Sequence, residues 1–266
     1  MLPEALPDAL RPEWPAPPNV SALMSTRLGG VSAAPFDTLN LRPPGLRGDA
    51  VDAPEAVAEN QRRFAAALGA TPVWLDQVHG ADVVRLTRAD LQPGRPHPRA
   101  DAAISTEPGI GCAVLVADCL PVLLCDRAGR AVGAAHAGWR GLAGGVVEHT
   151  LAALCEAAGC APDEVIAWLG ACIGPRQFEV GADVLEAFGA DSASPDPVRF
   201  VYRPRPDGAP RWLANLPQLA RDRLAAAGVK AISGGAWCTV EQPSRFFSFR
   251  RERVTGRQAA AIALRG

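Results

Sequence analysis

The stretch Ala131-Val-Gly-Ala-Ala-His-Ala-Gly-Trp-Arg-Gly-Leu-Ala-Gly-Gly145 predicts a buried strand that passes through a glycine-rich turn into a helix. Residues 131–135 are small and apolar, as in a strand that is covered on both faces. Apolar positions after Gly145 repeat with helical spacing, and Gly159 stands where a helix C-cap is expected. The stretch therefore specifies one strand-to-helix unit of an α/β protein.

Two reactive side chains, His136 and Arg140, stand at this join. A helix that begins beside a strand end presents unpaired N–H groups to an anion, and the guanidinium of Arg140 adds a fork of donors. We therefore expect the function of the chain to lie at the join. The alternative is a structural turn in which His136 is a core residue with its own hydrogen-bond partners.

Predicted strands and helices alternate along the chain without a break in composition or an internal repeat, which indicates one domain rather than two. The predicted fold is α/β, of the mixed α+β kind, with mixed β-sheets flanked by helices. Residues 1–18 carry six prolines and are expected to form an irregular N-terminal arm, which leaves residues 19–266 as a single catalytic domain. Strands are expected at 20–26, 73–80, 82–86, 111–117, 121–125, 131–135, 198–202, 229–232 and 259–264, with one more from 166, and helices at 52–68, 142–158, 180–188 and 216–227.

Composition limits the partners that this chain can have. Its 266 residues carry a net charge of −1 and no basic run, so we expect it to bind neither nucleic acid nor an acidic membrane surface. No apolar run approaches the roughly 18 residues of a membrane span, and seven cysteines without C-x-x-C spacing favour reduced thiols in the cytoplasm. We expect a cytoplasmic monomer that acts on a small molecule.

Three potential metal ligands, His79, Cys119 and His136, follow separate apolar segments. Two histidines and one cysteine suit zinc, and three protein ligands would leave a fourth position open for water, as in catalytic zinc sites. Because the three residues are far apart in the sequence, their spacing does not decide the matter. Cys119 and His136 could instead be the nucleophile and base of a metal-free cysteine hydrolase, acting for instance on cell-wall peptides.

Three more side chains are candidates because of their neighbours. Arg27 precedes two glycines in a turn that could be a second anion cradle, or simply an exposed arginine on a glycine turn. Asn40 lies within a short apolar segment, where a buried amide needs a specific partner. Asp118 stands with Cys119 between two buried-type runs, and an ionisable pair at such a break is costly unless it has a task.

Several motifs occur together between about Ser25 and Leu264, namely Gln77-Val-His-Gly80, Ala117-Asp-Cys119, His136-Ala-Gly-Trp-Arg-Gly141, Ile173-Gly-Pro175, Phe247-Ser-Phe-Arg-Arg251 and Thr255-Gly-Arg257. Together they resemble the YfiH-type family, first described as laccase-like multicopper polyphenol oxidoreductases and later as purine nucleoside phosphorylases with adenosine deaminase activity. The resemblance implies a zinc site at His79, Cys119 and His136, with phosphate and adenosine, inosine, guanosine or methylthioadenosine as substrates. It also makes Arg27 and Asn40 pocket residues.

The resemblance implies two reactions at one site, with Asp118, Cys119 and Arg140 as catalytic residues. In deamination, zinc-activated water attacks C6 of adenine while Asp118 or a nearby acid moves protons. In phosphorolysis, phosphate attacks the ribose C1′ while Arg27, Arg140 and Arg250 hold its oxygens. A copper-dependent polyphenol oxidase is the least favoured alternative, because several copper ions need many histidines and the chain has four.

Overall fold

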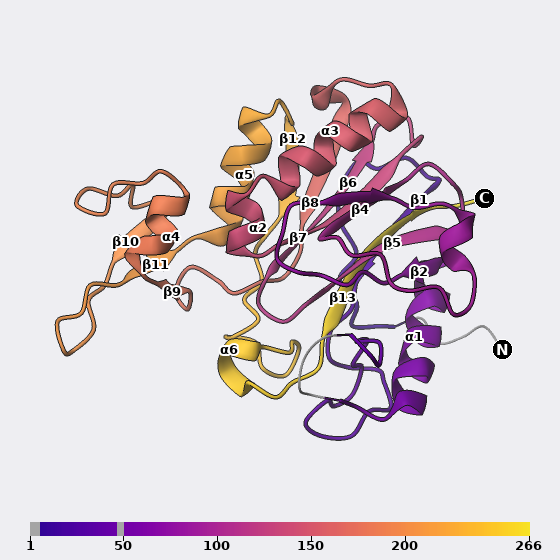
Figure 1. The fold of residues 1–266 in the computed structure, drawn as a ribbon, viewed down its shortest axis with the longest axis horizontal. Helices are drawn as coiled ribbons and strands as arrows, with labels where there is room; N and C mark the ends of the chain where they lie inside the picture. Colours follow the sequence, from indigo (N-terminus) through magenta and orange to yellow (C-terminus); the bar gives the residue numbers. More distant parts are fainter. Residues whose placement is uncertain (1–5, 47–50) are drawn as a thin grey trace.

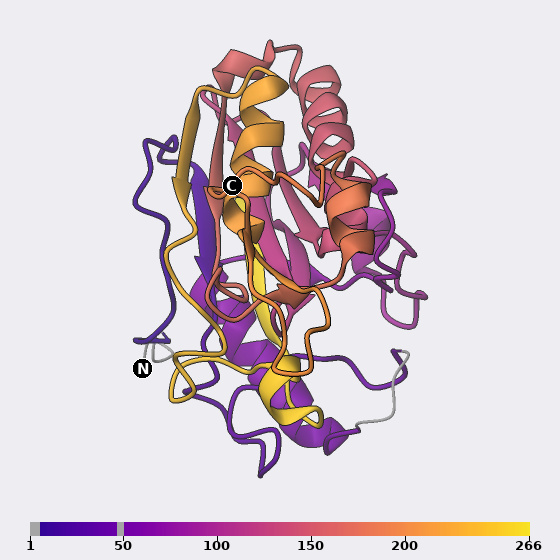
Figure 2. The ribbon, with the colours of Figure 1, turned by 90° about the vertical axis from the view of Figure 1, so that its left-hand side faces the viewer.

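The computed structural model describes residues 6–46 and 51–266 and arranges them in four successive layers (Figures 1 and 2). Helices α3 (Val146–Ala158) and α5 (Leu216–Ala226) cover one face of a six-stranded sheet. The other face of this sheet packs on a four-stranded sheet, whose outer face is covered by α1 (Pro54–Leu68). Two sheets packed face to face between helices confirm the predicted mixed α+β class.

The four-stranded sheet has the order β1-β13-β5-β2, in which only β2 and β5 run parallel. Its strands are β1 (Val20–Met24), β13 (Gln258–Leu264), β5 (Ile110–Val116) and β2 (Thr71–Val73). The six-stranded sheet has the order β12-β8-β6-β7-β4-β3 and is antiparallel except for its outer pairs. Its strands are β12 (Ala231–Gly234), β8 (Val165–Leu169), β6 (Leu120–Asp126), β7 (Val132–Ala137), β4 (Ala102–Ser105) and β3 (Val83–Arg85).

A small lobe projects from this body on the left of Figure 1. It contains an antiparallel sheet of order β10-β11-β9 and the short helix α4. Its elements are β9 (Glu179–Val180), α4 (Ala182–Ala187), β10 (Phe200–Tyr202) and β11 (Trp212–Ala214). Four short helical segments complete the described chain, namely η1 (Arg88–Leu91), α2 (Trp139–Ala143), η2 (Pro162–Glu164) and α6 (Phe249–Glu252).

Strict alternation along β13 explains how one strand serves two cores. Ala259, Ala261 and Ala263 face α1, whereas Ala260, Ile262 and Leu264 face the six-stranded sheet. Successive side chains of a strand point to opposite faces, so this strand must be apolar at every position. All seven residues of β13 are buried, which is why the run 259–264 was recognisable in the sequence as a strand.

The two sheets end together at one edge of the sandwich. The turn 117–119 carries the chain from β5 in the four-stranded sheet to β6 in the six-stranded sheet. The C-terminal end of β7 and the N-terminal end of β13 reach the same edge, because each runs antiparallel to one of these strands. Loops and strand ends of both sheets therefore converge there.

Two sequence expectations about local structure are wrong. The helix predicted at 142–158 is two helices, because Gly145 adopts a left-handed φ of 92° between α2 and α3. The strands predicted at 73–80 and 82–86 are not a hairpin: β2 ends at Val73, β3 belongs to the other sheet, and residues 74–82 form a loop between them. Side-chain hydrogen bonds replace a strand ladder there, since the Gln77 amide exchanges two hydrogen bonds with the backbone of Leu115.

The predicted N-terminal arm is described from residue 6 onward, and residues 1–5 lie outside the described part. Residues 6–18 contain no helix or strand, but Leu10 exchanges two backbone hydrogen bonds of 2.8 Å with Met24 at the end of β1. In the described ranges, no helix has the length and apolar character needed to cross a membrane.

The packing between the sheets predicts where the fold is sensitive to truncation. Ile262 is fully buried there, so Ile262→Ala should lower the free energy of unfolding by about 2–5 kcal/mol, measured by chemical denaturation. The matched truncation Val201→Ala, at a half-exposed position of the lobe, should change it by less than about 0.5 kcal/mol. Equal losses in the two variants would contradict the proposed location of the core.

Candidate metal centre and its cavity

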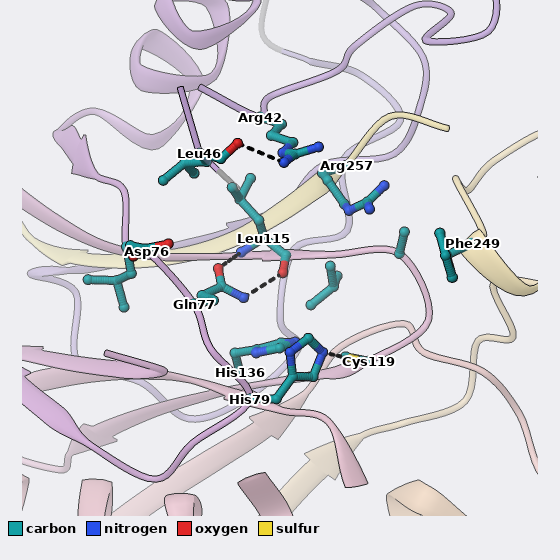
Figure 3. A pocket seen from close by; sticks show the side chains of 13 residues that line it. Arg42, Leu46, Asp76, Gln77, His79, Leu115, Cys119, His136, Phe249 and Arg257 are labelled. Carbon is teal, nitrogen blue, oxygen red and sulfur yellow. Dashed lines mark hydrogen bonds between the residues drawn. The ribbon is translucent and has the colours of Figure 1, made fainter. Parts of the chain in front are cut away.

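Three side chains from different segments meet where the two sheets end. His79 comes from the loop 74–82, Cys119 from the turn before β6, and His136 from the C-terminal end of β7. Their potential ligand atoms all lie within 4.8 Å of one another, and Cys119 Sγ is 3.8 Å from His79 Nε2. Figure 3 shows the two imidazoles and the thiol together at one side of a cavity. The structure therefore brings together the three predicted ligands.

The carboxylate of Asp101 positions both histidines of this cluster through hydrogen bonds. It is fully buried, and its Oδ1 accepts hydrogen bonds from His136 Nδ1 at 2.8 Å and from the backbone N–H of His79 at 2.9 Å. Its Oδ2 accepts from the backbone N–H groups of Val78 at 3.0 Å and Gly80 at 2.7 Å. One carboxylate thus fixes the loop that carries His79 and leaves Nε2 of His136 for the cluster.

Backbone contacts also fix the positions of the two histidines. The N–H of His136 donates to the carbonyl of Asp101 at 2.7 Å, so the two residues are tied by main chain as well as side chain. His79 itself has a φ of 61°, which is unusual for a residue other than glycine. Because three successive N–H groups of its loop bind one carboxylate, the loop is held in this conformation.

Two glycines of the turn after His136 allow the segments to approach. A Cβ on Gly141 would lie 2.7 Å from the carbonyl oxygen of Gly80, too close for the backbones to keep their places. A Cβ on Gly138 would lie 3.0 Å from Cys119 Sγ and 3.1 Å from His79 Cδ2. The predicted glycine-rich turn thus serves the close packing of the 78–80 loop and of the cluster.

The cluster shifts the pKa values of its own members. Burial raises the pKa of the Cys119 thiol, but the charges and hydrogen bonds of His136 and His79 outweigh burial and lower it to about 6. Burial lowers the pKa of His136, but the Cys119 thiolate and the Asp101 carboxylate raise it to about 9. Asp101 has a lowered pKa because His136 and the N–H groups of the loop outweigh its burial. The surroundings of Cys119 therefore favour its thiolate form.

The donor set fits zinc. Two imidazole nitrogens and one thiolate within 4.8 Å of one another are the ligands that zinc prefers, and the carboxylate behind His136 is the partner that such a ligand usually has. The cluster opens on a cavity of about 320 Å³. The cavity is lined by Arg42, Leu46, Leu75, Asp76, Gln77, His79, Leu115, Val116, Ala117, Cys119, His136, Phe249 and Arg257.

The predicted phosphate-holding arginines do not line this cavity. Arg27 is held by the carboxylates of Asp37 and Glu252. Arg140 is exposed on α2, with its guanidinium 4.3 Å from the centre of the neighbouring Trp139 ring. Arg250 donates to the backbone carbonyls of residues 177 and 179. Each of the three has protein partners outside the space that the cluster faces.

Asp118 and Asn40 are close to the cavity without lining it. Asp118 adopts a φ of 105°, and its two oxygens accept from the hydroxyl of Thr239 and the backbone N–H of Arg250, both at 2.6 Å. Asn40 is buried and bonded at both ends of its amide, with Nδ2 donating to Asp52 at 3.0 Å. Both residues hold the chain that surrounds the cavity.

Four residues of the site have no counterpart among the sequence predictions. Asp101 follows a proline-rich loop and had no signal beyond its place before an apolar run. Phe249 and Arg257 stand within the motifs at 247–251 and 255–257, and Arg42 follows Asn40 by two residues. A motif or a spacing does not distinguish an arginine that lines a cavity from one that holds a loop.

Comparisons with known proteins give a consistent result. Residues 21–265 match the model of the family described as multi-copper polyphenol oxidoreductase laccase. The chain is 49% identical to a Pseudomonas aeruginosa protein named as a purine nucleoside phosphorylase, over 96% of this chain and 98% of that one. It is 48% identical to an Escherichia coli protein named purine nucleoside phosphorylase YfiH, over 95% and 97%.

Two solved structures have the same fold. A Neisseria meningitidis protein of the DUF152 family matches with a TM-score of 0.84 at 42% identity, covering 97% of this chain and all of that one. YlmD from Geobacillus stearothermophilus also matches with a TM-score of 0.84, at 32% identity, covering 97% and 96%.

The contacts of Asp101 lead to a test of its positioning role. Asp101→Asn should weaken zinc binding about 10- to 100-fold, because an amide cannot accept from all four donors, measured by competition with a chromogenic chelator. The exposed neighbour Asp82 offers a matched control, and Asp82→Asn should bind zinc like the parent. Parent-like zinc affinity in a folded Asp101→Asn protein would contradict the role of this carboxylate.

The lowered pKa of Cys119 predicts its reactivity in metal-free protein. Alkylation by iodoacetamide should rise with pH through about 6, as the thiolate forms, and then stay level to pH 8. The buried Cys112 and Cys125, whose pKa values burial raises, should remain unmodified, as mass spectrometry of peptides would show. A Cys119 rate that keeps rising tenfold per pH unit between 7 and 8 would mean an unperturbed thiol.

Proposed function

The chain belongs to the family described as multi-copper polyphenol oxidoreductase laccase, and from that membership and its relatives we propose that it is a zinc-dependent purine nucleoside phosphorylase. The proposed substrates are inorganic phosphate and adenosine, inosine, guanosine or methylthioadenosine. We also propose adenosine deamination as a second activity of the same centre, in an enzyme that works as a cytoplasmic monomer. The relatives named as purine nucleoside phosphorylases cover almost the whole chain, which supports an enzyme of this kind.

The observation that carries the proposal is the composition of one cavity. Three ligands for zinc lie at one side of it, and the guanidinium groups of Arg42 and Arg257 lie at another. Its volume of about 320 Å³ is at the lower end of the range found for small-molecule sites. Phe249 adds an aromatic ring, of the kind on which purine bases stack. Such a cavity suits a ligand that combines an aromatic base with an anion.

Multicopper chemistry fits this chain poorly. A multicopper oxidase needs about four copper ions and correspondingly many histidines. Of the four histidines here, His149 binds the carbonyl of Ala81 through Nδ1, and His97 stands in the loop before β4, so two remain for a metal. Met24 is fully buried in the core and accepts a hydrogen bond from the backbone of Ala171. We therefore propose a single zinc ion held by His79, Cys119 and His136.

In phosphorolysis, a phosphate oxygen forms a bond to the ribose C1′ while the bond from C1′ to the purine nitrogen breaks. The electron pair of that bond leaves with the base, which takes up a proton. Bound zinc would supply Lewis-acid polarisation at this centre. The chain itself positions the two histidines through Asp101. Asp76, the carboxylate among the described lining residues, can accept hydrogen bonds from a nucleoside in the cavity.

Asp118 has a positioning role in this proposal rather than the proton-transfer role that the sequence predicts. Both of its oxygens accept short hydrogen bonds, so they are engaged with the protein. These bonds join the turn that carries Cys119 to Thr239 and to the start of α6. Replacing Asp118 should therefore affect the site by displacing Cys119.

A metal-free cysteine hydrolase is the second candidate, because the pKa of Cys119 is lowered to about 6 beside His136. A thiolate and an imidazolium in contact are also the resting state of a cysteine nucleophile. The two functions differ in their need for metal. A hydrolase of this kind keeps its activity when the metal is removed, whereas a zinc-dependent phosphorylase loses it.

Product analysis with inosine tests the proposal. Zinc-loaded protein should release hypoxanthine only when phosphate is present, together with an equal amount of ribose 1-phosphate, measured by chromatography. A chelator, or the substitution His79→Ala, should abolish the reaction, and added zinc should restore it in the chelated parent alone. Base release that is independent of phosphate, or activity that survives chelation, would exclude a zinc-dependent phosphorylase.

A further inference from the structure

Two arginines, Arg42 and Arg257, line the cavity away from the His-Cys-His cluster. In Figure 3 both lie on the opposite side of the cavity from the two imidazoles. Arg42 donates through Nη2 to the carbonyl of Leu46 at 2.9 Å, and Arg257 donates through Nη1 to the carbonyls of Thr255 and Gly256 at 2.9 and 3.0 Å. These contacts help to orient each guanidinium.

One buried amide, that of Asn40, binds the backbone of both arginines. Asn40 Oδ1 accepts the backbone N–H of Arg42 at 3.2 Å and that of Arg257 at 2.9 Å. Asn40 is itself fixed by the donation of its Nδ2 to the carboxylate of Asp52 at 3.0 Å. Two arginines from opposite ends of the chain are thus held at one place by a residue that has no access to the cavity. Asn40 is a positioning residue for this pair.

The two guanidinium groups are close enough for the charge of Arg42 to act on Arg257. Burial lowers the pKa of Arg257, and the nearby positive charge of Arg42 lowers it further. Among residues 6–46 and 51–266, no carboxylate forms an ion pair with Arg257. An anion with several oxygens can accept hydrogen bonds from both guanidinium groups at once.

We propose that Arg42 and Arg257 form the binding subsite for the phosphate substrate, an assignment that rests on the proposed phosphorolysis. Inorganic phosphate bound there faces the same cavity as the His-Cys-His cluster, so that a nucleoside between them meets both. The alternatives are less suitable, because Arg27 is paired with two carboxylates, and Arg140 and Arg250 lie outside the cavity. The subsite differs from the three arginines that the sequence favours.

Direct binding of inorganic phosphate tests the subsite without any need for turnover. Isothermal titration calorimetry would compare zinc-loaded parent, Arg42→Gln, Arg257→Gln and Arg257→Lys. Each glutamine variant should bind phosphate at least about tenfold more weakly, because it loses charge-assisted hydrogen bonds, and Arg257→Lys should recover part of the affinity. The control is Arg62→Gln on the exposed face of α1, which should bind phosphate like the parent.

Steady-state kinetics with inosine provides the second readout. In both glutamine variants the KM for phosphate should rise about tenfold or more, while zinc content stays at one per chain and the KM for inosine changes less than about twofold. Parent-like phosphate affinity in both variants would overturn the subsite, as would an equal loss in Arg62→Gln. A loss confined to Arg140→Gln would place the phosphate at the start of α2 and also overturn it.

The two proposals can fail separately. A parent that binds phosphate through Arg42 and Arg257 but releases no base would contradict phosphorolysis and leave the anion subsite in place. A parent that releases base only with phosphate, with a phosphate KM unchanged in the variants, would contradict the subsite and leave phosphorolysis in place. If one glutamine variant does not fold, as judged by circular dichroism, the other variant and Arg257→Lys decide the question.

Discussion

The site depends on one buried carboxylate. Burying the charge of Asp101 is costly unless every oxygen is satisfied, and here three backbone N–H groups and the His136 imidazole satisfy it. The same four bonds connect the 74–82 loop to the end of β7, two segments that belong to no common strand pair. The geometry of the cluster is therefore a consequence of satisfying Asp101, and the glycines at 138 and 141 make room for it.

Both sheets of the sandwich contribute residues to the cavity. The six-stranded sheet supplies His136 and, just before β6, Cys119, whereas the four-stranded sheet supplies the end of β5 and, just before β13, Arg257. The His-Cys-His cluster and the proposed anion subsite therefore face each other at the edge where both sheets end. This arrangement explains why the residues that line the cavity are scattered from 42 to 257 in the chain.

Much of this arrangement was accessible from the sequence, and the reasons for the rest are physical. Alternating or continuous apolar runs predicted the central strands. Cys119 and His136 were identifiable because they are reactive side chains beside buried apolar runs, and His79 because it stands in one of the motifs that carry the family resemblance. The role of an arginine was not accessible in this way. Arg27 has the local appearance of an anion site, but its partner Glu252 is 225 residues away, and only the fold reveals that its charge is already neutralised. For the same reason Asp101 and the 74–82 loop were missed, since their hydrogen bonds are long-range.

Zinc K-edge X-ray absorption on the purified protein tests whether His79, Cys119 and His136 form a zinc site. We expect about one zinc per chain with a first shell of one sulfur at roughly 2.3 Å and two imidazole nitrogens at roughly 2.0 Å, with any further ligand a light atom. The sulfur shell should disappear in Cys119→Ser. A shell of oxygen alone, a shell of several sulfurs, or a parent spectrum unchanged in Cys119→Ser would contradict the assignment.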